Sequence, residues 1–224
     1  MINKDLKKRI IDISYDKKLS HLGSCLTAVD IIDDIFKTKQ EDEKFILSSG
    51  HAGLALYVVL EKYSWINNPA FEFQPRFPPL NADKIFDHHG VHPDRCEECH
   101  IDCSSGSLGN GLPIAVGMAL ANKDKNVYCL ISDGECMEGS IWEALRVRAE
   151  NELDNLKVFV NYNGWGAYQE IEQYWLITRL RAFGVGLDDI IQTDVKEFPF
   201  LKGQQGHYKV MDDKDYEQAK KILE

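Results

Sequence analysis

Hydrophobic residues recur at helical spacing in the first part of the chain. This spacing predicts a helix over residues 6–13 and a second helix that follows Ser24 and runs to Phe36. A short apolar run at 45–47 predicts a strand, and a further helix is expected over about 53–63. We therefore expect this part of the chain to pack helices against one short strand.

The second half of the chain alternates between strand-like and helix-like segments. Apolar runs predict strands at 127–132 and 157–162, and helical spacing predicts helices at about 110–122, 139–151 and 172–183. The succession of strand, helix and strand is typical of a right-handed crossover between parallel strands. The pattern predicts an α/β domain with a parallel sheet.

Two segments lack this regular alternation. Residues 64–107 are rich in Pro, His, Asn and Cys, and we expect a long loop there that carries a binding surface, because loops of this length are usually functional or disordered. A Gly-containing stretch follows Phe183, and residues 212–223 predict a terminal surface helix. We expect residues 1–224 to form a single domain.

Composition narrows the class of protein. A chain of 224 residues with 44% hydrophobic residues is long enough for a buried core, and its net charge of −10 argues against a nucleic-acid or anionic-membrane surface. The apolar stretches at 54–60 and 112–121 are shorter than the ~20 residues that cross a bilayer, and the charged N-terminus lacks an apolar signal core. The six cysteines fit reduced thiols. We expect a soluble cytoplasmic protein.

Polar residues follow both predicted strands of the crossover. Asp133 and Asn163 stand 30 residues apart, and parallel strands bring their carboxyl ends side by side, where ligands of open α/β sheets bind. A carboxylate, an amide oxygen and a backbone carbonyl form an oxygen set that suits Mg²⁺ or Ca²⁺. Gly134 and Gly164 allow close backbone approach. Each dipeptide alone is a common turn; the pair at this spacing favours a metal site.

Several motifs resemble those of transketolases. Asp133, Gly134 and Glu135, followed by Asn163, resemble the thiamine diphosphate motif of that family, with Ser132 replacing its first glycine. Further similar segments stand in the family's order at residues 21–24 and 28–31, 49–57, 105–111, 115–119 and 137–139. The resemblance implies the thiamine diphosphate-binding fold, a parallel sheet with helices on both faces.

The resemblance also implies a set of site residues. The metal, Mg²⁺ or Ca²⁺, would be held by Asp133, Asn163 and the carbonyl of Trp165. His21, His51 and His92 would line the substrate channel as catalytic residues. The implied cofactor-binding residues are His51, Gly106, Ser107, Leu108, Asp133, Gly134, Glu135, Glu138, Asn163 and His207.

Transketolases transfer a two-carbon ketol unit from a ketose to an aldose, and their second half carries the glutamate that protonates the aminopyrimidine ring. No such domain fits within residues 1–224. The resemblance therefore implies a split enzyme, in which this chain needs a separate subunit carrying the pyrimidine-binding domain, as in a heterotetramer. Residues 184–224 are also shorter than the corresponding part of most transketolases.

Other interpretations remain open. A related thiamine diphosphate enzyme, such as a synthase or 2-oxo acid dehydrogenase component, would share the diphosphate site but need other substrate residues. A non-catalytic subunit that binds cofactor or stabilises a partner is a third possibility, which the retained His21 and His51 argue against. Separately, Cys96, Cys99, His100 and Cys103 have spacing that suits zinc, although no distant second pair of ligands is evident.

Overall fold

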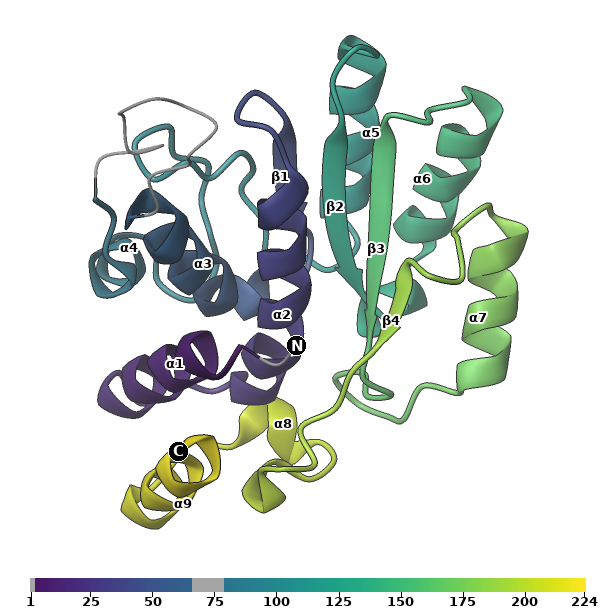
Figure 1. Cartoon of the computed structure of the whole chain (residues 1–224). Coiled ribbons are helices and arrows are strands. Elements are labelled where there is room, and N and C mark those ends of the chain that lie inside the picture. The colour runs from purple at the N-terminus through teal and green to yellow at the C-terminus, as the bar shows by residue number, and fades with distance from the viewer. Residues whose placement is uncertain (1–2, 66–78) are drawn as a thin grey trace.

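The computed structural model describes residues 3–65 and 79–224 (Figure 1). Its single sheet has four parallel strands, in the spatial order β1 (Lys44–Leu47), β2 (Val127–Ser132), β3 (Leu156–Tyr162) and β4 (Ile190–Gln192). Ser132 is in register with Asn161, and helix α6 (Gly139–Glu150) connects β2 to β3. This confirms the parallel crossover that the sequence predicts.

Helices cover both faces of the sheet, as predicted (Figure 1). On one side lie α1 (Lys4–Asp16), α2 (Leu22–Thr38), α3 (Gly53–Trp65), α4 (Ala82–His89) and α9 (Asp213–Leu223); on the other lie α5 (Gly111–Ala121), α6 and α7 (Gln173–Ala182). Each face of the sheet has its own hydrophobic core. Successive strand residues point to opposite faces, so Phe45 and Leu47 belong to the core beneath α1, α2 and α3, and Ile46 belongs to the core beneath α5, α6 and α7. Burial on both faces explains why the central strands are almost continuously apolar.

The expected loop at 64–107 is wrong in part, because it contains helix α4. The side chain of Asn81 accepts a hydrogen bond from the Lys84 amide at the start of this helix, and Gly90, with a φ of 73°, ends it. Only Ala82 and Ile85 are buried in α4, which is too short a pattern for periodicity to reveal. Part of the expected loop, residues 66–78, lies outside the described residues.

The last strand, β4, has only three residues and stands at the edge of the sheet beside β3. Side-chain hydrogen bonds anchor the chain that follows it. Asn161 donates from Nδ2 to Thr27 Oγ1 at 3.0 Å, and its Oδ1 accepts from Thr193 Oγ1 at 2.6 Å. These bonds connect α2, β3 and the end of β4, and they position the segment that leads to the short helix α8 (Gln205–Tyr208) at the carboxyl edge of the sheet.

Two further features bear on the environment of the protein. In the described part of the chain, no helix has the length and apolar character needed to span a membrane. All six cysteines lie within that part, and each is a free thiol.

Candidate functional site

A cavity of about 200 Å³ lies at the carboxyl edge of the sheet. Its walls come from the ends of β2 and β3, from the start of α2, from the turn that precedes α3, and from α8. The residues expected from the sequence that line it are His21, His51, His92, Gly106, Leu108, Asp133, Gly134, Asn163, Trp165 and His207. Tertiary folding thus brings together groups that are spread over most of the chain.

Asp133 is fully buried at the end of β2. Its Oδ2 accepts hydrogen bonds from the backbone amides of Asn163 at 3.0 Å and Gly164 at 2.7 Å, and its Oδ1 accepts from the amide of Gly134 at 2.9 Å. Gly164 has a φ of 85°, a conformation that favours glycine and turns its amide toward the carboxylate. Burial outweighs these bonds and raises the pKa of Asp133 to about 6.

Asn163 and Trp165 bring further oxygen atoms to the same wall. The side-chain oxygen of Asn163 accepts a hydrogen bond from the Trp165 amide at 2.9 Å, and the Trp165 carbonyl oxygen lies 3.4 Å from His207 Nε2. Carboxylate, amide and carbonyl oxygens together are the ligand types that Mg²⁺ and Ca²⁺ prefer. The donor set present here therefore fits a hard divalent cation.

The electrostatics of the cavity favour a cation beside any phosphorylated ligand. Among the described residues that line the cavity there is no lysine or arginine, while Asp133 contributes a buried carboxylate. A diphosphate entering this space without a metal would face that carboxylate with no positive side chain to offset it. A divalent ion between the carboxylate and the diphosphate would offset the negative charge of both groups.

Three histidines meet at the cavity. The ring centroids of His21 and His51 are 5.2 Å apart, and that of His207 lies 6.2 Å and 6.0 Å from them. Burial lowers the pKa of all three imidazoles, with the neighbouring histidines adding to the effect on His21 and His51, and it brings that of His51 to about 3. The cluster is therefore neutral at physiological pH and can donate or accept hydrogen bonds.

The backbone fixes two of these histidines. His21 adopts a φ of 61° at the start of α2, and its amide donates to the carbonyl of His207 at 2.7 Å. His207 Nδ1 lies 3.1 Å from Ser24 Oγ. His21 Nδ1 is buried and has no hydrogen-bond partner within the described structure. A buried nitrogen without a partner carries a desolvation cost, which a hydrogen bond to a bound ligand would relieve.

A glycine-rich loop forms the opposite wall. The ring of His92, which is exposed, lies against Gly106, where a Cβ atom would come within 3.0 Å of the ring. A Cβ on Gly50 would come within 2.6 Å of the Gly106 backbone nitrogen. The two segments are therefore in backbone contact, which allows Gly106 and Leu108 to present main chain and an apolar side chain to the cavity.

Three residues expected to bind cofactor lie elsewhere. Ser107 and Glu138 are exposed and do not line the cavity. Glu135 is buried behind it, where its carboxylate accepts hydrogen bonds from Ser48 Oγ at 2.6 Å and from the amides of Gly109 and Ser132 at 3.0 Å each. Glu135 thus joins the ends of β1 and β2 to the glycine-rich loop and has a supporting position.

Sequence reasoning also missed residues that line the cavity. Ser24, Ser49, Asn161 and Tyr208 contribute to its walls. Asn161 lies at the end of β3, two residues before Asn163, and this spacing is a signal that could have been read, because alternate residues of an extended segment share a face. Ser24 and Ser49 lie within segments that resemble family motifs, whereas Tyr208 reaches the cavity only through the packing of α8.

A parallel sheet with an oxygen-lined cavity beyond its carboxyl edge is typical of α/β domains that bind phosphorylated ligands. Residues 9–175 match the family model described as transketolase, thiamine diphosphate binding domain. The chain belongs to this family.

Individual relatives agree with this assignment. One subunit of the apulose-4-phosphate transketolase of Phocaeicola vulgatus is 32% identical over 171 residues, which cover 70% of this chain and 58% of that protein. Human transketolase is 35% identical over 161 residues, covering 65% of this chain and 24% of that protein. The chain thus aligns with less than two thirds of either relative.

The fold agrees as well. The crystal structure of transketolase from Campylobacter jejuni superposes with a TM-score of 0.75 at 20% identity, covering 99% of this chain and 42% of that one. Transketolase from Leishmania mexicana superposes with a TM-score of 0.63 at 16% identity, covering 99% and 44%. Both likenesses place the whole described chain in the thiamine diphosphate-binding fold.

Proposed function

We propose that this chain is the diphosphate-binding subunit of a two-chain, transketolase-type enzyme that transfers a two-carbon ketol unit from a ketose to an aldose. The observation that supports it most directly is the buried Asp133 carboxylate in a cavity whose described lining has no lysine or arginine. Such a cavity favours a diphosphate that binds together with a divalent cation. Mg²⁺ or Ca²⁺ with thiamine diphosphate matches this preference.

The residues of the chain would have two roles: some would bind the metal and the cofactor, and others would orient the substrate. Asp133, Asn163 and the Trp165 carbonyl would hold the metal, and the Gly106 backbone and Leu108 would contact the cofactor. Thiamine diphosphate, when bound, supplies the carbanion chemistry that breaks and forms the carbon–carbon bond. The protein then has to position the substrate, exclude water and move protons.

The histidines are suited to positioning the substrate and moving protons. His21 and His51 are neutral in the pH range where enzymes usually work, because burial lowers the pKa of each imidazole. A neutral imidazole can donate one hydrogen bond to a sugar hydroxyl and accept another, and can carry a proton between them. The unpartnered Nδ1 of His21 is one atom at which such a proton could be held. His92, on the open side of the cavity, would face the incoming substrate.

A partner subunit is part of the proposal. Large side chains are exposed near the carboxyl edge and after β3: Met137 is 62% exposed, Tyr168 88%, Tyr174 67% and Trp175 59%. Tyr174 and Trp175 lie with ring centroids 5.4 Å apart, and exposed aromatic residues of this kind are enriched at protein interfaces. A second chain carrying the pyrimidine-binding domain would cover them, and two copies of each chain would form a heterotetramer. The six free thiols suit a reducing compartment such as the cytoplasm.

Calorimetry with thiamine diphosphate and Mg²⁺ tests the cofactor site. We expect binding that needs both components, and we expect Asp133→Ala to abolish it, because the variant removes the charged metal ligand. Asp124→Asn, an exposed carboxylate ahead of β2, is the matched control and should bind as the wild type does. Undiminished affinity in Asp133→Ala would overturn the metal assignment.

Reconstitution tests the transferase activity. The partner is first isolated by copurification with this chain, and the pair is then assayed with ketose donors and aldehyde acceptors. We expect two-carbon transfer by the mixture and by neither chain alone. Activity of this chain by itself would refute the split enzyme. Cofactor binding by the pair with decarboxylation of 2-oxo acids in place of ketol transfer would identify the related thiamine enzyme instead, and binding with neither activity would identify a supporting subunit.

A further inference from the structure

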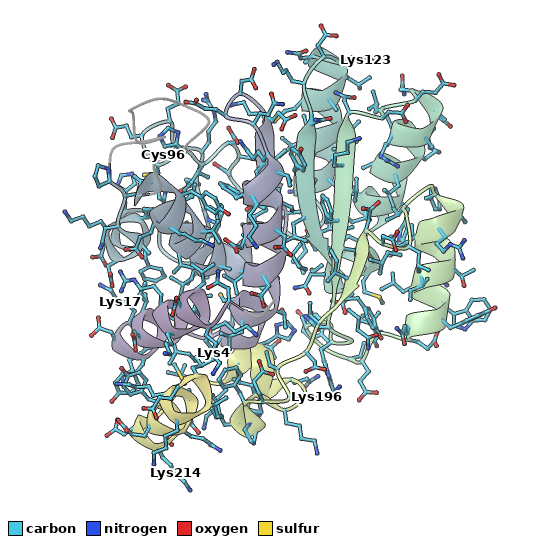
Figure 2. All side chains as sticks on the ribbon, in the orientation of Figure 1. Lys4, Lys17, Cys96, Lys123, Lys196 and Lys214 are labelled. Atoms are coloured by element: carbon cyan, nitrogen blue, oxygen red, sulfur yellow. The ribbon has the colours of Figure 1, made fainter. Side chains whose placement is uncertain are left out.

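A second group of metal-ligating side chains lies outside the cavity. His89 is the last residue of α4, and Cys96 and Cys99 stand on the loop that follows. Figure 2 shows Cys96 on the side of the molecule where α3 and α4 lie. The ligand atoms of these three residues all lie within 4.8 Å of one another, and they form the only such group of three among the described histidines, cysteines and acidic residues. We propose that His89, Cys96 and Cys99 bind a zinc ion.

The ligand atoms lie close to the separations found around one zinc ion, and one distance matches them. Zinc–sulfur bonds of about 2.3 Å and zinc–nitrogen bonds of about 2.0 Å at tetrahedral angles place the ligand atoms ~3.5–3.8 Å apart. In the structure His89 Nε2 lies 3.4 Å from Cys99 Sγ. All three ligand atoms lie within 4.8 Å of one another, so no separation has to shrink by more than about 1 Å to reach these values.

The two cysteines stand on a short turn, residues 96–101, that hydrogen bonds hold closed. Cys96 and Ile101 exchange two backbone hydrogen bonds of 2.9 Å, which close the turn. The amide of Cys99 donates to Cys96 Sγ at 3.2 Å, and His100 adopts a φ of 56° that lets the chain reverse. Both sulfur atoms are thereby presented on one side. A metal binds both cysteines as thiolates, so zinc binding at this turn would release their protons.

The chemistry of the set selects the metal. Two thiolates and an imidazole favour Zn²⁺ over Mg²⁺ and Ca²⁺, which prefer oxygen ligands such as those at Asp133. Three protein ligands leave the fourth tetrahedral position to a water molecule or another group. The sequence pattern lacked a distant ligand to accompany Cys96 and Cys99, and folding supplies it as His89 through the position of α4.

The site has a structural consequence for the cavity. The loop on which the cysteines stand is closed at its base by two hydrogen bonds, from the Arg95 amide to Ser104 Oγ at 2.8 Å and from the Ser105 amide to the Pro93 carbonyl at 3.0 Å. His92 and Gly106 flank this base and line the cavity. A zinc ion at the tip would tie the loop to α4 and so hold His92 and Gly106 in place. Its role is to position these residues, without contact with the substrate.

Metal analysis of the full chain, purified without chelators and dialysed, tests the site. We expect about one zinc per chain. His89→Asn, Cys96→Ser and Cys99→Ser should each fall well below that value. His88→Asn, on the neighbouring residue of the same helix, and Cys103→Ser, in the same loop but outside the group, are the matched controls and should keep their zinc.

A spectroscopic measurement on the wild-type chain requires no variant to fold. After removal of zinc and addition of Co²⁺ alone, we expect thiolate-to-cobalt charge-transfer absorption and the intense visible bands of tetrahedral cobalt. Zinc should abolish both signals. A wild-type chain that retains no zinc and gives no thiolate–cobalt signal, or one in which Cys96 and Cys99 are joined by a disulfide under reducing conditions, would overturn the proposal. Equal zinc loss in His88→Asn and His89→Asn would also count against it.

Discussion

Replacing Asp133 by Asn should change how the stability of the metal-free protein depends on pH. The wild-type carboxylate is buried with no described cationic side chain lining its cavity, and its pKa is raised to about 6 from an ordinary 3.8. The folded state therefore binds a proton more tightly than the unfolded state does. Stability contributed by this group is fully present below pH 3.8 and is lost as the pH rises through 6.

The size of the effect follows from the two pKa values. A displacement of this size corresponds to roughly 3 kcal/mol of unfolding free energy, at ~1.4 kcal/mol for each tenfold change in proton affinity. Asp133→Asn removes the titration. It also disturbs the hydrogen bonds from Gly134, Asn163 and Gly164, but that cost does not depend on pH. The difference between the two proteins therefore isolates the carboxylate.

Urea unfolding at several pH values between about 4 and 7.5, without divalent metal, measures this difference. We expect the stability of the wild type relative to Asp133→Asn to fall by roughly 2.5 kcal/mol across that range, since at about pH 4 the unfolded carboxyl is already partly ionised. Adding Mg²⁺ and thiamine diphosphate at the upper end of the range should stabilise the wild type and leave the variant unchanged, because only the wild type gains a cation–carboxylate interaction.

Two results would refute the reasoning. A difference that stays constant across this pH range would show that the Asp133 carboxylate is solvated or paired in solution. A difference that grows as the pH rises would show that its pKa is lowered in the folded state, as for a carboxylate with a cationic partner. Either result would remove the electrostatic argument for a metal at this site.

Three further predictions concern the frame of the cavity. Glu135→Ala should lose about 3 kcal/mol of unfolding free energy in urea, because three buried donors lose their acceptor, whereas exposed Glu143→Ala should change it little. His51 should stay neutral at about pH 5 in an NMR titration; a midpoint near 6.5 would contradict its burial. Gly111→Ala should lower the melting temperature, since its Cβ would lie 2.5 Å from Ser48 Oγ, and an unchanged value would show that the helix shifts freely.

Much of the sheet could be predicted because its signals are local. The apolar runs of β2 and β3 and the helical spacing between them encode the crossover within one continuous segment. Helix α4 and strand β4 were not predicted, because each is too short for periodicity to show and each is stabilised by its neighbours. Asn81 and Gly90, which begin and end α4, are recognisable as caps only once the helix is known.

The candidate site, like the fold, could be predicted from the sequence only in part. Asp133 and Asn163 could be placed together from the sequence, since each follows a predicted strand and parallel strands end at one edge. Glu135 is close to Asp133 in its motif, yet its side chain turns away from the cavity toward Ser48. A motif shared with a family identifies the segment, whereas the direction of each side chain depends on what packs behind it.

The sequence by itself determined the α/β class, the parallel crossover between the two central strands and the oxygen-bearing side chains that follow them, because periodicity and spacing along one segment encode these features. Tertiary structure alone decided which distant residues meet. The packing of α8 brings His207 to His21 and His51, and the position of α4 brings His89 to Cys96 and Cys99. Such meetings depend on the packing of whole helices across the core, for which no local pattern carries a signal.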